Sequence, residues 1–178
     1  MPGDSNAPEV TAIIAVLVDN EPGILARVVG LFSGRGYNIE SLTVAPVEEG
    51  GNLSRINIVT LGTPMVIEQI KAQLGRLVPV RRIADLTAEG PHIAREMALI
   101  KVICPHGSGE AGLKRAEALR LADAFRARVI DATTESFIFE MTGATEKLDA
   151  FLDLMRPLGL AEISRTGVAA MARGTRVI

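Results

Sequence analysis

The sequence is poor in the side chains from which most catalytic and metal centres are built. Its 178 residues include one cysteine, Cys104, and two histidines, His92 and His106. A single cysteine excludes a disulfide within the chain, and so few thiols and imidazoles leave little material for a zinc site or a histidine-based catalytic centre. No coherent set of nucleophile, base and orienting group can be assembled. We therefore expect no catalytic residue and no metal in this chain.

Aromatic residues and excess charge are scarce as well. Phe, Trp and Tyr together make up 3% of the chain, Trp is absent, and the formal net charge is −2. The chain thus lacks the stacking platforms of single-strand binders and a basic face of the strength that nucleic acids require. We expect no nucleic-acid partner.

Long apolar segments are missing too. The longest apolar run near the start, Ala12 to Val18, is far shorter than the roughly 18 residues that span a membrane. The opening segment MPGDSNAPEV has neither the basic nor the apolar region of a signal peptide. The sequence therefore predicts a cytoplasmic protein without membrane contact, with a short disordered N-terminus at residues 1–10.

What the sequence does contain is a regular alternation of strand and helix patterns. The segment TAIIAVLV is β-branched and continuous, as in a central strand, and residues 23–35 place apolar side chains on one helical face. Two strands follow, YNIESLTVAPV and LSRINIVTL, joined across the hairpin signal EEGGN. Residues 63–77 again have helical spacing, and VRRIADL reads as a closing strand. Residues 11–90 are therefore predicted to fold as βαββαβ.

The same order recurs in residues 91–178. Sliding the chain over itself places Ala12-Ile13-Ile14 on Ala98-Leu99-Ile100, and it places the helix around Ile67 on the helix around Leu148. We predict an α+β fold of two tandem ferredoxin-like βαββαβ modules. Such modules leave one sheet face and an edge strand without cover, so we expect a homodimer that pairs through the first helix and the second strand.

The junction between the first strand and the first helix is the strongest candidate for a binding site. The first amides of a helix have no partner within it and attract anions, and Gly23, which has no Cβ, would let a carboxylate approach the amides of Gly23, Ile24 and Leu25. Asn20, together with Asn38 from a second copy, could then bracket an amino acid. The structural alternative is that Asp19 or Asn20 only caps the helix, Gly23 only permits the turn, and Asn38 only lies in a loop.

The segment DNEPGILARVVGLFSGRGYNIESLTVAP resembles the N-terminal ACT domain of the small regulatory subunit of acetolactate synthase (acetohydroxyacid synthase). The later segments LSR, KLDAF and SRTGVAAMARG also resemble that family, and the similarity extends from about Thr11 to Gly174. The resemblance implies an ACT domain at residues 11–90, for effector binding and dimerisation, and a C-terminal ACT-like domain at residues 91–178.

The resemblance also implies a function for the chain. Small subunits of this family bind a catalytic large subunit that carries thiamine diphosphate, Mg²⁺ and FAD and condenses pyruvate with pyruvate or 2-oxobutyrate. They raise its activity and make it sensitive to valine, in some members also to leucine or isoleucine. The chain itself would then be a regulator without cofactors. The rival interpretation is a free-standing tandem ACT sensor that regulates another client, although no helix-turn-helix segment is evident.

The family's effector contacts can be carried over residue by residue. Asn20, Gly23, Ile24 and Leu25 match its carboxylate and amino-group contacts, Asn38 and Ile39 match contacts donated across the dimer, and Ala45 matches a position near the site. The second repeat has CPHGSGEAG where the first has VDNEPGIL. Because this turn lacks the asparagine and the glycine followed by bulky apolar residues, we predict no second equivalent effector site there.

Overall fold

The computed structural model describes residues 7–178, and the chain divides into two compact units. Unit 1 comprises the chain up to Ala94 together with Val168–Ile178, and unit 2 comprises Arg95–Gly167. The first boundary lies four residues beyond the predicted one. Residues 168–178, assigned from the sequence to the second module, belong instead to unit 1.

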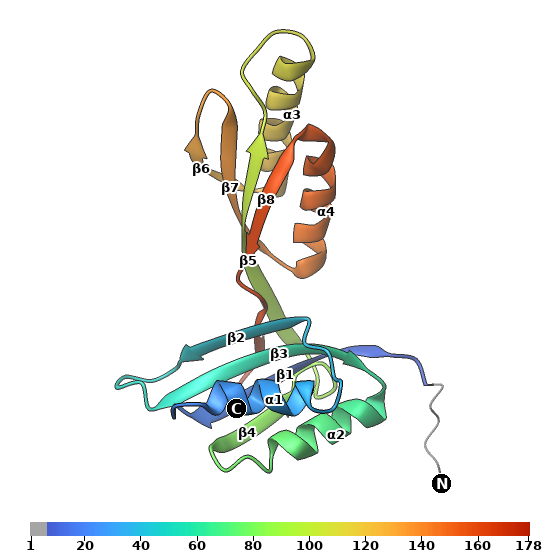
Figure 1. The fold of residues 1–178 in the computed structure, drawn as a ribbon, viewed down its shortest axis with the longest axis vertical. Helices are drawn as coiled ribbons and strands as arrows, with labels where there is room; N and C mark the ends of the chain where they lie inside the picture. Colours follow the sequence, from blue (N-terminus) through green and yellow to red (C-terminus); the bar gives the residue numbers. More distant parts are fainter. Residues whose placement is uncertain (1–6) are drawn as a thin grey trace. The chain divides into compact units, whose positions relative to one another are not determined.

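Unit 1 has the predicted βαββαβ order, with α1 and α2 on one face of a sheet whose strand order is β2-β3-β1-β4 (Figure 1). Its elements are β1 (Val10–Asp19), α1 (Ile24–Ser33), β2 (Ser41–Pro46), β3 (Leu53–Gly62), α2 (Pro64–Leu74) and β4 (Val80–Asp85). Of the N-terminal segment predicted to be disordered, residues 1–6 lie outside the described residues, and Val10 already belongs to β1.

The core of unit 1 follows from the two periodicities of its sequence. Alternate residues of β1 point towards the helices, and the apolar face of α1 packs on them. The buried cluster contains Ala12, Ile14, Val16, Val18, Ile24, Val28, Leu31, Phe32, Ile56, Ile58, Ile67, Ile70 and Leu74. The helix-facing core therefore consists of side chains spaced by two in the strands and by three or four in the helices.

The other face of the unit 1 sheet is covered by the end of the chain. Strand β9 (Ala169–Ala172) pairs with β5, and Val168 and Ala170 are buried in a second cluster with Ala15, Val59, Ala84 and Leu86. The free face that we expected on this module is thus occupied within the same chain.

Unit 2 repeats the order, with α3 and α4 against a sheet whose strand order is β6-β7-β5-β8. Its elements are β5 (His92–Ile103, which begins in unit 1), α3 (Glu110–Phe125), β6 (Arg128–Ala132), β7 (Ser136–Gly143), α4 (Thr145–Met155), the 3-10 turn η1 (Arg156–Leu158) and β8 (Leu160–Arg165). Cys104, predicted to be a buried residue at a strand end, is 3% exposed directly after β5.

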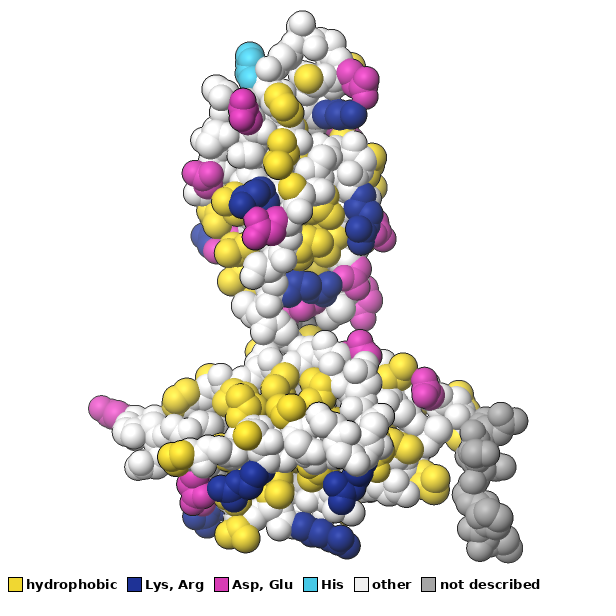
Figure 2. Space-filling view, in the orientation of Figure 1, with side chains coloured by type: hydrophobic (Ala, Val, Ile, Leu, Met, Phe, Trp, Pro, Cys, Tyr) yellow, Lys and Arg dark blue, Asp and Glu magenta, His cyan; other side chains and the backbone are white. Residues whose placement is uncertain are grey.

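The outer face of the unit 2 sheet carries charged and apolar side chains together. Lys101 pairs with Glu162 at 2.7 Å, and Arg128 pairs with Glu140. A shallow hollow of about 130 Å³ lies beside the first pair, lined also by Leu99 and Ile138. In Figure 2, hydrophobic side chains and charges of both signs are interspersed on the visible surface of this unit.

The two units correspond in detail, although the predicted alignment of their central strands was wrong by two residues. The N–H of Asp19 donates to Pro79 O and that of Ile103 to Gly159 O, both at 2.8 Å. The pairing with the edge strand also shifts register at matching places, between Leu17 and Val18 in β1 and between Lys101 and Val102 in β5. Ile14, not Ala12, therefore corresponds to Ala98. Because strand side chains alternate, a shift of two residues keeps the same face inward, and the hydrophobic pattern cannot detect it.

The predicted alignment of the second helices is confirmed. Helices α2 and α4 are both 11 residues long and begin after Thr63 and Ala144. Within residues 7–178, no helix is long and apolar enough to cross a membrane, and no group of three or more metal-ligating side chains is found.

Candidate effector site

The junction from β1 to α1 is a tight turn around a left-handed glycine. Gly23 has φ 82° and ψ 0°, and a Cβ built there would meet no atom within 4 Å. Only glycine takes this conformation without strain, so Gly23 sets the direction in which α1 leaves the strand. The space outside the glycine is therefore open to a ligand.

Two of the three amides proposed from the sequence remain available at this helix end. The N–H of Ile24 already donates to Glu21 O at 3.2 Å, and that of Arg27 donates to Gly23 O at 3.0 Å. Among the described residues, no acceptor is found for the N–H groups of Gly23 and Leu25. The expectation that Ile24 offers a free N–H is therefore wrong. Gly23 and Leu25 keep N–H donors at the open end of the helix.

Neither Asp19 nor Asn20 caps the helix, which removes one part of the structural alternative. Gly23 occupies the N-cap position, and no side chain bonds to the helix there. Asp19 instead binds Arg81, whose pKa is raised by that hydrogen bond and by the carboxylate's charge. The side-chain amide of Asn20 donates to Gly51 O at 2.7 Å, which ties the junction to the β2–β3 hairpin.

The apolar residues after the glycine have different surroundings. Ile24 is 5% exposed and lies in the helix-facing core, whereas Leu25 is 39% exposed. Ile24 can therefore offer a ligand its backbone but not its side chain. Of these two residues, Leu25 is the one that can present an apolar surface to a ligand.

Asn38 and Ile39 lie at the far end of α1, away from Gly23. The N–H of Asn20 bonds to Asn52 O and that of Glu40 to Val59 O, both at 2.8 Å. Those two acceptors are seven residues apart along the β3 segment, which corresponds to about 23 Å. One chain therefore does not bring Asn20 and Asn38 together.

The local contacts of Asn38 and Ile39 fix the start of β2. Thr60 Oγ1 donates to Asn38 O at 2.6 Å, and the Asn38 side-chain amide donates to the carboxylate of Glu40. Ile39 is half-buried against the helix-facing core. This bond uses one of the two N–H groups of the Asn38 side chain, so a ligand that approached the same amide would share it with Glu40.

Ala45 lies on the opposite face of the sheet from α1. It pairs with Arg55 of β3, whose guanidinium donates to Ala170 O in the covering segment. Side chains directly opposite each other on paired strands share a face. The structure thus separates Ala45 from the helix end that carries Gly23 and Leu25.

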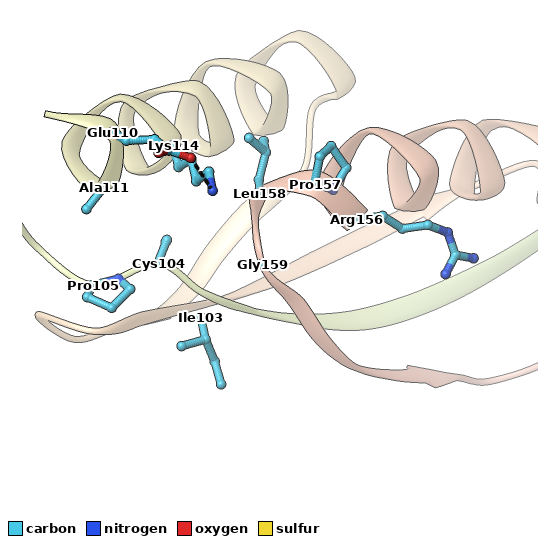
Figure 3. A pocket seen from close by; sticks show the side chains of 10 residues that line it. All are labelled: Ile103, Cys104, Pro105, Glu110, Ala111, Lys114, Arg156, Pro157, Leu158 and Gly159. Atoms are coloured by element: carbon cyan, nitrogen blue, oxygen red, sulfur yellow. Dashed lines mark ion pairs between the residues drawn. The ribbon is translucent and has the colours of Figure 1, made fainter.

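The equivalent junction of unit 2 has a different character (Figure 3). A cavity of about 530 Å³ lies there, lined among others by Cys104, Glu110, Lys114 and Gly159. Glu110 stands in the first turn of α3, 2.8 Å from Lys114, whereas α1 has no acid in its first turn. Burial raises the pKa of the Cys104 thiol. An acidic first turn disfavours a carboxylate ligand. The absence of an equivalent effector site at this turn stays a prediction.

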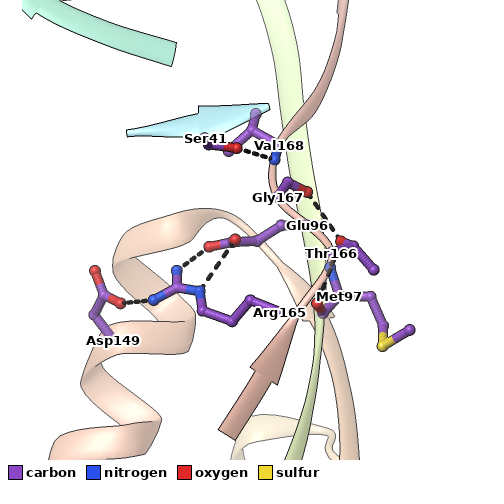
Figure 4. A network of polar contacts seen from close by, with 8 residues as sticks. All are labelled: Ser41, Glu96, Met97, Asp149, Arg165, Thr166, Gly167 and Val168. Carbon is purple, nitrogen blue, oxygen red and sulfur yellow. Dashed lines mark hydrogen bonds and ion pairs between the residues drawn. The ribbon is translucent and has the colours of Figure 1, made fainter. Parts of the chain in front are cut away.

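Residues that the sequence analysis missed connect β2 to the end of the chain. Ser41 binds the N–H of Val168 (Figure 4), Thr43 binds its carbonyl group, and Arg55 binds Ala170. The signal was the alternation of polar residues, Ser41 and Thr43, along a strand whose other positions are apolar. It would have indicated a polar contact on that face, although not its partner.

Comparison with known proteins assigns both halves of the chain. A family model described as an AHAS small subunit-like ACT domain matches residues 14–82, and one described as the small subunit of acetolactate synthase matches residues 95–174. A protein of Archaeoglobus fulgidus named "Probable acetolactate synthase small subunit" is 46% identical over 163 residues, which are 92% of this chain and 97% of that protein.

Two further relatives agree with this assignment. The acetolactate synthase isozyme 3 small subunit of Escherichia coli is 42% identical over 167 residues, covering 93% of this chain and 98% of that protein. The crystal structure of the acetolactate synthase small subunit from Thermotoga maritima matches with a TM-score of 0.79 at 37% identity, covering 94% of this chain and 99% of the other.

Proposed function

The chain belongs to the acetolactate synthase small-subunit family, and on this premise we propose that it regulates a catalytic large subunit by binding a branched-chain amino acid at the β1–α1 junction. In this proposal the large subunit carries thiamine diphosphate, Mg²⁺ and FAD, and this chain raises its activity and confers feedback inhibition by L-valine or a related amino acid. Unit 1 performs effector binding and dimerisation.

The observation that carries the proposal is the open end of α1 at Gly23. A ligand carboxylate would accept hydrogen bonds from the N–H groups of Gly23 and Leu25, and the helix dipole would add to their attraction. Bonds to a charged group contribute about 1.5–3 kcal/mol each. Two such bonds and the burial of a small aliphatic side chain would give an affinity between roughly millimolar and micromolar, as a metabolite sensor requires.

A second copy of the chain would complete the site. In a two-fold dimer each contact occurs twice, so the Gly23 end of one α1 can meet the Asn38 end of its partner, and the converse. The separation of these two ends within one chain supports such a shared site. The side-chain oxygen of Asn20 would accept a hydrogen bond from the ligand's ammonium group, while the side-chain nitrogen still donates to Gly51 O.

Calorimetry of the purified chain with L-valine, L-leucine and L-isoleucine tests the proposal. We expect at least one of the three to bind with one molecule per chain, because the acidic junction of unit 2 contributes no site. The Asn20→Ala chain should bind about tenfold or more weakly, since the ammonium group loses its acceptor.

Gly23→Asp and Gly23→Asn form a matched pair for the carboxylate subsite. Asp and Asn adopt the left-handed conformation more often than other side chains and have the same size, so the two variants share its strain and differ chiefly in charge. The aspartate should abolish binding and the asparagine should weaken it less, with both variants folded by circular dichroism. If no branched-chain amino acid binds the folded wild-type chain, or if both variants bind equally well, the proposed site is wrong.

A further inference from the structure

The strand that follows Asn38 and Ile39 holds the segment by which the chain returns from unit 2. Val168 is bound at both of its peptide groups by side chains of β2, of which Figure 4 shows Ser41. Its N–H donates to Ser41 Oγ at 2.8 Å, and its carbonyl accepts from Thr43 Oγ1 at 3.3 Å. A displacement of β2 would therefore act directly on this one residue.

A second polar contact extends this attachment along β3. Arg55 donates from its terminal nitrogen to Ala170 O at 2.7 Å and from Nε to Asn57 Oδ1 at 3.2 Å. Asn57, which is 6% exposed, donates in turn to Thr43 Oγ1 at 3.1 Å. The Thr43 hydroxyl thus accepts a hydrogen bond from Asn57 and donates one to Val168. A displacement of either β2 or β3 therefore acts on the carbonyl groups of Val168 and Ala170.

The attachment is also apolar and is continuous over several residues. Val168 and Ala170 are each 6% exposed against Ala15, Val59 and Ala84 of the sheet. Alternate residues face the sheet, as in a strand laid upon it. The return segment, defined here as residues 168–172, is therefore fixed to unit 1 by packing as well as by hydrogen bonds.

The chain just before the return segment is fixed within unit 2. Arg165, at the end of β8, binds the buried carboxylate of Glu96 and lies 2.7 Å from Asp149, and Thr166 exchanges hydrogen bonds with Met97 (Figure 4). Only Gly167 separates Thr166 from Val168. One residue spans at most about 3.6 Å, so the chain between the two attachments has little slack.

We propose that the contact of Ser41 and Thr43 with Val168 transmits effector binding from unit 1 to unit 2, which rests on the function proposed above. A ligand that binds the Asn38 side chain competes with Glu40 for this side chain and so moves the start of β2. Ser41 lies three residues after Asn38, and its hydroxyl carries this movement to Val168 and on to β8. The ligand and unit 2 are then coupled because both bias the same segment of β2.

Hydrogen exchange of the full-length chain with and without L-valine tests this coupling. In the wild-type chain we expect saturating valine to change exchange at the amides of β2, at Val168 and in β8 of unit 2, by about fivefold or more. In the double variant Ser41→Ala/Thr43→Val we expect the effect on β2 to remain and the effect on β8 to disappear. Ser164→Ala, a change of an exposed serine in β8, is the matched control and should behave as wild type.

Two further measurements separate the possible failures. Calorimetry of the double variant should give a valine affinity within about threefold of wild type, while the complex with the large subunit should lose at least half of its inhibition by valine. If valine binds the wild type and the double variant alike and β8 still responds in both, the coupling proposal is overturned and the proposed function stands. If the wild-type chain binds no valine, both are overturned.

Discussion

The two units share the order of their elements and the register of their central strands, yet the outer faces of their sheets differ. In unit 1 that face is covered by Val168 and Ala170 from the end of the chain, and in unit 2 it carries the Lys101–Glu162 and Arg128–Glu140 ion pairs. The cover is thus a property of the segment after β8 and not of the βαββαβ order. Fold type alone therefore does not say which face of such a module is free.

The strand-to-helix junctions differ in the same way. Helix α1, which follows Gly23, has no acid in its first turn. Helix α3, which follows Gly109, begins with Glu110, which pairs with Lys114. The dipole of α1 thus meets no acid at its positive end, whereas a glutamate already stands at that end of α3. The two junctions therefore differ in charge, and the one in unit 2 carries an ion pair within the first turns of its helix.

Removing the segment that covers the unit 1 sheet should have the largest effect on stability. A chain ending at Gly167 exposes Ala15, Val59 and Ala84 and leaves Arg55 without Ala170. We expect a loss of unfolding free energy on the order of 3–6 kcal/mol in unit 1, from the burial of one valine and several hydrogen bonds. Urea unfolding with hydrogen exchange to assign each transition measures this loss.

A shorter deletion serves as the control for this truncation. A chain ending at Arg173 keeps Val168 and Ala170 in place and should lose less than half as much. The cover would have no stabilising role if the chain ending at Gly167 unfolded at the same urea concentration as the full-length chain.

Glu96→Gln should have the next largest effect, and in unit 2. Glu96 is 5% exposed and its carboxylate binds the Arg165 guanidinium, whose pKa is raised chiefly by that hydrogen bond. The glutamine removes the charged acceptor while Arg165 keeps its pair with Asp149, so we expect the cost of one charge-assisted hydrogen bond, about 1.5–3 kcal/mol. Thermal unfolding gives this value, and Glu162→Gln, which breaks the exposed pair with Lys101, should change little. Equal effects of the two variants would contradict the assigned burial.

Acid should act on unit 2 more than on unit 1, and this is the smallest effect. The carboxyl pKa values of Glu110, Glu117 and Glu162, all in unit 2, are lowered by hydrogen bonds to Lys114, Arg120 and Lys101 respectively. A lowered pKa in the folded state contributes stability above the unfolded value of about 4.3, and this stability is lost as the pH falls through the folded value. Unfolding midpoints between about pH 6 and pH 3 should therefore decline more steeply for unit 2. A steeper decline for unit 1 would contradict these assignments.

Much of the fold could be predicted from the sequence because its signals are local. The periods of two and of three to four identified the strands and helices, and Thr63 followed by Pro64 marks the start of α2. The position of residues 168–178 could not be predicted, because Val168, Ala170 and Ala172 are small and their alternation gives only a weak strand signal. Ser41 and Thr43, which bind Val168, lie more than a hundred residues before it in the sequence.

The turn at the candidate site was predictable from the sequence, whereas the placement of its atoms was not. The glycine that must adopt φ 82° was evident from its place between a strand and a helix. That Ile24 N–H already bonds to Glu21, and that Ala45 faces away from α1, depends on turn geometry and strand register. Neither can be derived from the types of residue alone.

A mixed-dimer experiment tests most directly the claim that two copies of unit 1 build one effector site. Gly23→Asp and Asn38→Ala chains are first titrated separately with L-valine and then mixed, exchanged and titrated again. We expect neither variant to bind alone and the mixture to regain binding, because a heterodimer carries both defects in one site and none in the other. If the mixture stays inactive while both variants are folded and dimeric, the shared site is contradicted.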